Sequence, residues 1–243
     1  MPIEEHASTL WAVSSFDRLH EQSQRGLDGP TMLSSTLMAE VTALERRHEE
    51  SDALEVLAAC VRLQEPALVY LRFAELVWPV TIFPAQMIYH SPRPLTEAPE
   101  GSLARVTAMG IEPPAFRPPG HPMSDRVAAD DCYYSLAPAL WRLALHGPRG
   151  RLLQEIGGTA AYRVLRNLRV DDLNLPGALG AAAERLRREA ASLKQIAAWP
   201  GMSAERGARM LNALYLASNL MVTRSSTIAQ AEPRRSLFGW LGR

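Results

Sequence analysis

The residues of this 243-residue chain that could carry chemistry are few and scattered. His90 is followed by Ser91, and a serine with a histidine as its base can act as a nucleophile, although such a neighbour is more often structural. Gly157 and Gly158 form a glycine pair, but the Lys-Ser/Thr signature of a nucleotide-binding loop is missing. A helix end is therefore the better interpretation of the two glycines.

A second group of polar residues lies near the middle of the chain. Asp130, Asp131 and Cys132, together with His121, could form one corner of a metal site. Their surroundings are rich in proline, and the spacing places no further ligand. We therefore expect no metal site and no cofactor, and we predict that the protein is not an enzyme. A catalytic role would require His90 and this group to converge in one pocket.

The stretch from Ser192 onwards has the strongest local signals. Ser192 and Gln195 form an S-x-x-Q capping box, which begins a helix, and Pro200-Gly201 stops that helix. Ser203 then caps a second helix. A short strand over residues 221–224 follows it. This order of elements is the plan of a winged helix-turn-helix.

Further helices and turns complete this module over residues 175–225. Residues 176–190 predict a preceding amphipathic helix. The second helix is expected to bury an apolar face and to end in a left-handed cap at Ser218-Asn219. The apolar positions assigned to that face are Met210, Leu211, Leu214 and Leu220.

The polar face of this module determines what it could touch. In DNA-binding members of this class, the second helix enters the major groove. The candidate contacts with DNA or with a partner are Arg206, Arg209, Asn212, Arg224, Arg187 and Arg188. The whole chain has 26 basic and 26 acidic residues, so its net charge does not indicate a nucleic-acid partner. We therefore expect a protein-interaction role, and DNA binding is the alternative.

The first part of the chain predicts helices followed by strands. Helices are expected over residues 8–24, from Thr31 onwards, and from a cap at Asp52 to about Gln64. The apolar stripe of the second helix repeats every seven residues, which also permits pairing of subunits in a homo-oligomer. Its charged end is interpreted as a solvated surface.

Three strand-like runs come next. They span Ala67–Phe73, Leu76–Phe83 and residues 86–90, and they are rich in valine, isoleucine and aromatic residues with short turns between them. Such runs predict a β-meander. Pro79 interrupts the middle run, so an edge position or a bulge is expected there.

Four short motifs in this region occur in a recognisable order. They are Leu54-Glu55-Val56-Leu57, Ala67-Leu68-Val69-Tyr70-Leu71, Val80-Thr81-Ile82-Phe83 and Met87-Ile88-Tyr89-His90-Ser91. In this order they resemble the PATAN domain of bacterial signalling proteins, over about residues 52–91. The resemblance implies a bacterial regulatory protein with a non-catalytic, protein-interaction role.

Proline divides the rest of the chain. Eight of the 18 prolines fall between residues 92 and 122, so residues 92–125 are predicted to be a linker, ordered where residues 106–111 can pack. It would separate residues 1–91 from a helical region over residues 126–228 that contains the winged helix. Asp171-Asp172 in that region is interpreted as a helix cap or loop.

Residues 229–243 are predicted to be a flexible tail with an apolar end. The tail could dock into a partner's groove, rest on an anionic membrane surface, or fold back on the chain. Its candidate docking residues are Leu237, Phe238, Trp240 and Leu241.

Composition sets the remaining expectations. Hydrophobic residues make up 47% of the chain, and no run is long enough to span a membrane. The N-terminus lacks a charged-then-apolar leader, so no signal peptide is expected. Cys60 and Cys132 are expected to be free thiols. The prediction is a cytoplasmic α+β protein, mostly helical, with N-terminal helices, a short β-meander and a C-terminal winged helix.

Overall fold

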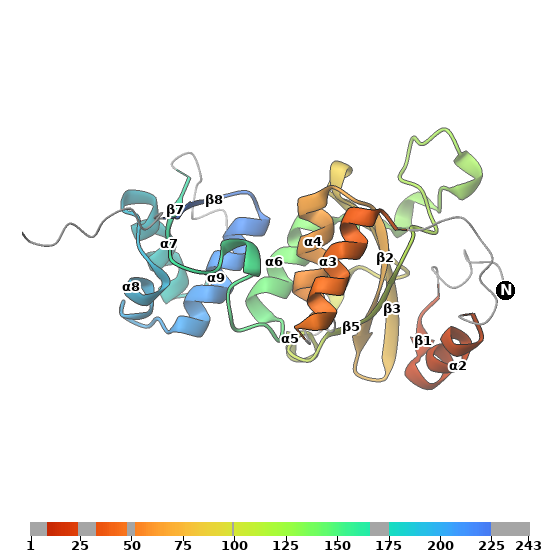
Figure 1. Ribbon diagram of the computed structural model, residues 1–243, viewed down its shortest axis with the longest axis horizontal. Coiled ribbons are helices and arrows are strands. Elements are labelled where there is room, and N and C mark those ends of the chain that lie inside the picture. The colour runs from red at the N-terminus through yellow and green to blue at the C-terminus, as the bar shows by residue number, and fades with distance from the viewer. Residues whose placement is uncertain (1–8, 24–32, 48–51, 99, 166–174, 225–243) are drawn as a thin grey trace, which may run out of the picture.

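The computed structural model describes residues 9–23, 33–47, 52–98, 100–165 and 175–224. Figure 1 shows an elongated molecule, with a sheet and its covering helices at one end and a mainly helical unit at the other. The predicted α+β class is confirmed. The expectation of a mostly helical chain is not confirmed, because helices take less than half of the residues described.

The N-terminal half is built on an antiparallel sheet with the strand order β5-β2-β3-β4-β6, in which β1 also pairs with β3. The predicted meander β2-β3-β4 is confirmed. Its third strand is shorter than expected, because Pro84–Gln86 forms a 3₁₀ turn. The strands are β1 (Trp11–Ala12), β2 (Ala67–Phe73), β3 (Leu76–Phe83), β4 (Ile88–His90), β5 (Thr107–Glu112) and β6 (Tyr133–Ser135).

Pro79 lies in an inner strand, but at a point where one side of that strand is open. On one side it is the register partner of Tyr70 in β2. On the other side, β1 pairs with residues 76–77 of β3 and β4 pairs with residues 81–83. Proline has no amide hydrogen to donate, so it is tolerated in the gap between these two neighbours. The edge-like environment expected for Pro79 is thus present locally, without a bulge in this ladder.

Helices cover both faces of the sheet. On one face, α4 (Ala53–Leu63) and α6 (Leu136–His146) contribute to the main core, and α3 (Ser35–Arg46) packs against α4. On the other face, Phe16 of α2 (Val13–Ser23) packs in a smaller apolar cluster. The predicted cap of α4 is confirmed, because the Asp52 side chain accepts a hydrogen bond from the Glu55 amide at 3.2 Å.

The segment predicted to be a linker, residues 92–125, belongs to the sheet instead. It contains the short helix α5 (Glu100–Leu103) and strand β5, which pairs with β2 along its length. Leu103 and Val106 are buried in the main core. The prolines therefore shape turns around an edge strand, and the segment does not separate two parts of the chain.

The predicted helical region, residues 126–228, also needs correction. Its first elements, β6 and α6, belong to the N-terminal sheet and its cover. The C-terminal half follows with β7 (Ala160–Val164), α7 (Ala178–Arg188), α8 (Leu193–Ala197), α9 (Ala204–Leu216) and β8 (Leu220–Arg224). Strands β7 and β8 form an antiparallel pair. The region is thus helical with strands from both sheets.

Local signals predicted the C-terminal helices well. The capping box of Ser192 and Gln195 is present, and Ser203 caps α9. Two details differ from expectation. The left-handed residue after α9 is Ser218, with φ of 56°, and not the asparagine that follows it. Leu220 begins β8, so it does not belong to the apolar face of α9.

Removing the α8 cap should have a modest effect. A Ser192→Ala variant is expected to lose about 1 kcal/mol of unfolding free energy, because the Gln195 amide loses its acceptor. Urea titration of both proteins measures the difference. A matched Ser14→Ala change, at an exposed position within α2, should cost less. Equal losses in the two variants would contradict the importance of this cap.

Candidate functional site

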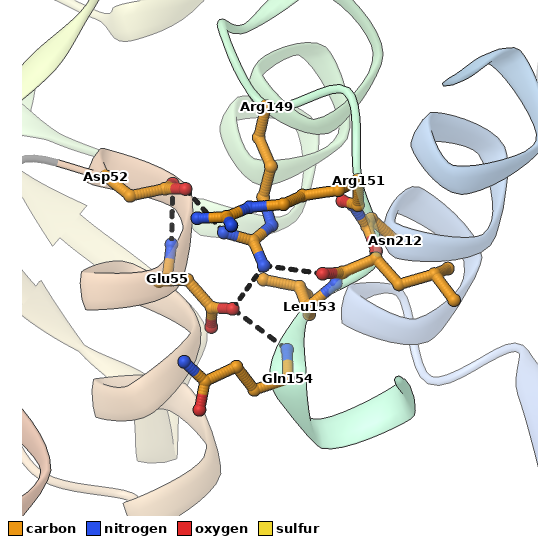
Figure 2. A network of polar contacts seen from close by, with 8 residues as sticks. Asp52, Glu55, Arg149, Arg151, Leu153, Gln154 and Asn212 are labelled. Carbon is orange, nitrogen blue, oxygen red and sulfur yellow. Dashed lines mark hydrogen bonds and ion pairs between the residues drawn. The ribbon is translucent and has the colours of Figure 1, made fainter. Parts of the chain in front are cut away.

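A buried polar network lies where the two halves of the molecule meet (Figure 2). Residues 147–159 connect α6 to β7, and they run between α4 on one side and α9 on the other (Figure 2). Four side chains hold this loop: Asp52 and Glu55 at the start of α4, Arg149 in the loop, and Asn212 in α9. We call these four residues and the loop the joint.

Arg149 is the centre of the joint. Its side chain is 2% exposed, and it forms ion pairs with Asp52 and, at 2.5 Å, with Glu55. It also donates a hydrogen bond to the carbonyl of Leu152 at 2.5 Å. The same Glu55 carboxylate accepts a hydrogen bond from the Gln154 amide at 2.8 Å. A buried charge is tolerated when it is paired and hydrogen-bonded in this way.

Asn212 holds the loop from the opposite side. It is fully buried, its Oδ1 accepts from the Leu153 amide at 2.9 Å, and its Nδ2 donates to the Arg151 carbonyl at 2.9 Å. The loop lacks the regular backbone hydrogen bonds of a helix or sheet. The Asn212 amide replaces two of them, because it binds one backbone donor and one backbone acceptor. The sequence predicted that Asn212 contacts DNA or a partner. Its burial corrects this prediction, because a buried side chain cannot make such a contact.

Arg209 is also used inside the molecule. Its guanidinium donates to the carbonyls of Leu145 and Gly147, at 3.1 Å and 2.5 Å, and pairs with Glu205 on its own helix. These two carbonyls lie at the end of α6, where helix carbonyls lack internal partners. Arg209 therefore caps α6 from α9 and joins the two halves, with only 19% of its side chain exposed.

The other proposed contact residues are more accessible. Arg206 and Arg224 are exposed, although each donates to a backbone carbonyl, of Gly201 and Glu155 respectively. Arg187 and Arg188 share an ion pair with Glu184 on α7. The structure therefore divides the six candidates, with Asn212 and Arg209 directed inward and the remaining arginines near the surface.

Helix α9 as a whole is a core element. Of residues 207–214, seven are buried and only Arg209 is partly exposed. The helix packs against α6, α7 and α8. In a winged helix that binds DNA, the first turns of the recognition helix have an exposed face that contacts the bases. Within α9 only residues 204–206, at its very start, are exposed.

A small hollow lies beside the joint. It has about 30 Å³ of space, which holds about two water molecules. Pockets for small-molecule ligands are roughly ten times larger or more. Arg62 lines the hollow and forms ion pairs with Glu40 at 3.0 Å and with Glu155 at 2.8 Å. The hollow is therefore a packing feature of the joint. Its lining residues are Glu40, Leu44, Glu55, Ala58, Ala59, Arg62, Gln154, Glu155 and Tyr215.

His90 and Ser91 are buried in the sheet and do not form a nucleophile with its base. Within the described chain, neither His90 Nδ1 nor Ser91 Oγ has a hydrogen-bond partner, so the two are not bonded to each other. The His90 ring packs against Phe116 and Tyr133, with centroid distances of 4.3 Å and 5.4 Å. Burial lowers the pKa of His90 to about 4. The histidine is thus a neutral packing residue at neutral pH.

This burial predicts a pH dependence of stability. At pH 5 the unfolded chain protonates His90 and the native chain does not, so stability is complete above about pH 6.5 and falls as pH decreases toward about 4. Between pH 7 and pH 5, the free energy of unfolding should fall by about 2 kcal/mol because of His90. A His90→Leu variant should not show this part of the loss. Urea titrations at both pH values measure this. Parallel losses in the two proteins would contradict it.

Asp130, Asp131 and Cys132 lie in an exposed 3₁₀ turn. Burial and the neighbouring Asp131, 3.7 Å away, raise the pKa of Cys132, which therefore stays a thiol at neutral pH. His121 accepts a hydrogen bond from the Met123 amide. Among the residues that the structure describes, no three metal-binding side chains come together.

Two groups of predicted residues lie outside the described residues. They are Asp171-Asp172 and the tail residues Leu237, Phe238, Trp240 and Leu241. The predictions for them, including a membrane contact of the tail, stay predictions.

Sequence patterns did not identify the joint, although one signal was present. Glu55 lies in the run Ala53-Leu54-Glu55-Val56-Leu57, and every residue of this run is buried. A carboxylate in such an apolar run requires a buried partner. Nothing in the sequence says that this partner is Arg149, which lies 94 residues later in a loop between two glycines.

Comparisons with known proteins add no assignment. No family model, characterised protein or solved structure matches this chain. Within the described ranges, no helix has both the length and the apolar character needed to cross a bilayer.

Proposed function

We propose that the chain is a non-catalytic regulatory or adaptor protein that acts through contacts with another protein. In this proposal the C-terminal half is a winged helix, with α8 and α9 as its helix-turn-helix and β7 and β8 as its wing. The order of the elements and the β7-β8 pair support this interpretation. The N-terminal half would be a PATAN-like interaction domain, as the motifs over residues 52–91 suggest.

The observation that carries the proposal is the burial of α9. The helix that would read bases packs between its own unit and α6, and two of its polar residues, Arg209 and Asn212, bind backbone of the N-terminal half and the joint. A winged helix fixed in this way has lost its usual reading face. Many folds serve several functions, so a module of this plan is equally suited to present a protein-binding surface.

The alternative is a DNA-binding transcriptional regulator. It is supported by the exposure of Arg206, Arg224 and Arg188, which could contact phosphates at the start of α9 and on neighbouring elements. It is weakened by Asn212, because asparagine is the side chain suited to read adenine and here it is buried. The homo-oligomer suggested by the seven-residue repeat of α3 is a further proposal.

Site-specific photocrosslinking in the native cell tests the proposal. Large apolar side chains that are exposed mark the positions for the crosslinking residue, which are Met38, Leu76, Met123 and Met221, between 41% and 52% exposed. We expect at least one position to yield a discrete protein adduct that a buried control position, Leu140, does not yield. Crosslinks only to DNA, from positions on β8, would instead support the alternative.

A further inference from the structure

The charges of this chain are divided between its two parts, although its formal net charge is zero. Residues 1–159 contain 20 acidic and 13 basic residues, whereas residues 160–224 contain ten basic and five acidic residues. A neutral total therefore conceals an acidic first part and a basic second part. The charges of each part act locally, because salt screens exposed charges from one another beyond about 8–10 Å.

Six of the eight basic residues that the structure describes in the second part lie toward one end of the molecule. Figure 1 shows α7 and α8 at the end that lies farthest from β1 and α2. Arg185, Arg188 and Lys194 are exposed on these two helices, and the Arg188 side chain is 75% exposed. We call this surface the basic end, and its members are Arg163, Arg185, Arg187, Arg188, Lys194 and Arg206.

Contacts show that most of these residues belong to one continuous surface. Arg163 of β7 donates to the carbonyl of Arg188 at 3.2 Å, which brings β7 and the end of α7 together. Arg185 lies 4.5 Å from the centre of the Trp199 ring in the turn between α8 and α9. Arg206 donates to the carbonyl of Gly201 in the same turn at 2.6 Å. The surface thus extends from β7 over α7 to the start of α9.

Three carboxylates reduce the charge of this surface but do not cancel it. Glu184 pairs with Arg187 and Arg188, and Glu189 pairs with Arg185. Glu205 lies at the start of α9 and pairs with Arg209. Exposed ion pairs of this kind are weak, so a stronger anion can displace them. Six basic groups against three acidic groups leave the basic end positive.

The apolar residues of this end are directed into the core. Leu179, Ala183 and Leu186 of α7 are buried, as is Ile196 of α8. A helix that lies on a membrane needs an exposed apolar face, which α7 does not have. A stable protein interface needs a central apolar patch with few charges, and half-buried Trp199 is the large aromatic side chain of this surface. An extended polyanion can bind without an exposed apolar face or a central apolar patch.

We propose that the basic end binds the phosphate backbone of nucleic acid without reading its sequence. Phosphate contacts from lysine and arginine dominate non-specific binding and need no base-reading helix. This distinguishes the site from the regulator considered above, since α9 contributes only its first turn. The proposal does not rest on the adaptor function, because the crosslinking positions chosen for that function lie outside the basic end.

Fluorescence anisotropy with a random-sequence 20-base-pair duplex tests the proposal on the full chain. Binding should weaken with salt, with a slope of about −0.9 in log K against log salt for each phosphate contact. A variant with Arg185→Gln, Arg187→Gln, Arg188→Gln and Lys194→Gln should bind at least about tenfold more weakly at 100 mM salt, and the magnitude of its slope should be smaller by about 3.6.

A matched variant controls for net charge. Arg46→Gln, Arg47→Gln, Arg105→Gln and Arg126→Gln also remove four exposed positive charges, all outside the basic end. This control should keep the affinity and the slope of the unchanged chain. Thermal melting of both variants should match the parent, because the substituted side chains lie at the surface and surface ion pairs contribute little to stability. A loss of binding with unchanged melting supports the proposal.

Competing anions provide the outcomes that would overturn it. Polyglutamate of equal charge and vesicles with 30% phosphatidylserine are offered in the same assay. Tighter binding to polyglutamate would assign the surface to an acidic protein, and tighter binding to vesicles would assign it to a membrane. No binding of duplex at 20 mM salt, or equal loss in both four-site variants, would also overturn the proposal.

Discussion

Replacing Arg149 with methionine should lower the free energy of unfolding by about 3–5 kcal/mol, because Asp52 and Glu55 are left without their buried cation. Methionine fills a similar volume, so the loss reports charge and hydrogen bonding more than packing. Denaturant titration at pH 7 measures it. An exposed arginine of the N-terminal half, Arg105, provides the matched change to methionine and should cost less than about 0.5 kcal/mol.

The same site allows a stricter test of the cause. A triple variant with Arg149→Met, Asp52→Asn and Glu55→Gln removes the three charges together. Asparagine also keeps the cap of α4, since it is a favoured capping residue. This variant should recover part of the loss, because neutral amides cost less to bury than unpaired carboxylates. If the triple variant is less stable than the single one, the charge network is not what holds the joint.

Replacing Asn212 with leucine should cost about 2–4 kcal/mol, since two backbone groups of the joint lose their partners. The side chains have similar size, so the leucine occupies the space but accepts nothing from Leu153 and donates nothing to Arg151. Denaturant titration again gives the change. The control is Gln86→Leu at an exposed amide, for which a change within about 0.5 kcal/mol is expected.

The effect of Asn212→Leu should also be local to the joint. Hydrogen exchange of the Leu153 and Gln154 amides should become faster in the variant, while the amides of β2 and β3 keep their relative protection. A variant that is as stable as the parent, with unchanged exchange at Leu153, would show that the loop is held without Asn212. The two halves would then be joined mainly by apolar packing of α6 against α9.

Local chemistry explains why much of the fold could be predicted. The capping residues Asp52, Ser192 and Ser203 act on amides three residues away, so the chain alone reveals them. Strands β2 and β3 follow from runs rich in β-forming residues that are separated by a tight turn. These elements have the predicted bounds, because neighbours in sequence determine them.

Long-range pairing explains what the sequence did not reveal. Strand β5 lies in a proline-rich segment, and its place beside β2 is determined by a partner more than 30 residues away. Asn212 has the helical spacing of an exposed polar residue, but it is buried against the loop of the joint, where it bonds Leu153 and Arg151. The charge division between residues 1–159 and 160–224 is visible in the sequence, yet a total of zero conceals it.

Helix α9 joins the two halves of the molecule, and we propose that it does not read bases. This is tested by selection from a randomised duplex library with the full chain as bait. We predict that the recovered duplexes share no sequence motif, because Arg209 and Asn212 are occupied within the molecule. A recovered motif that changes when Arg206 or Arg209 is substituted would contradict the claim, because it would place α9 in the groove.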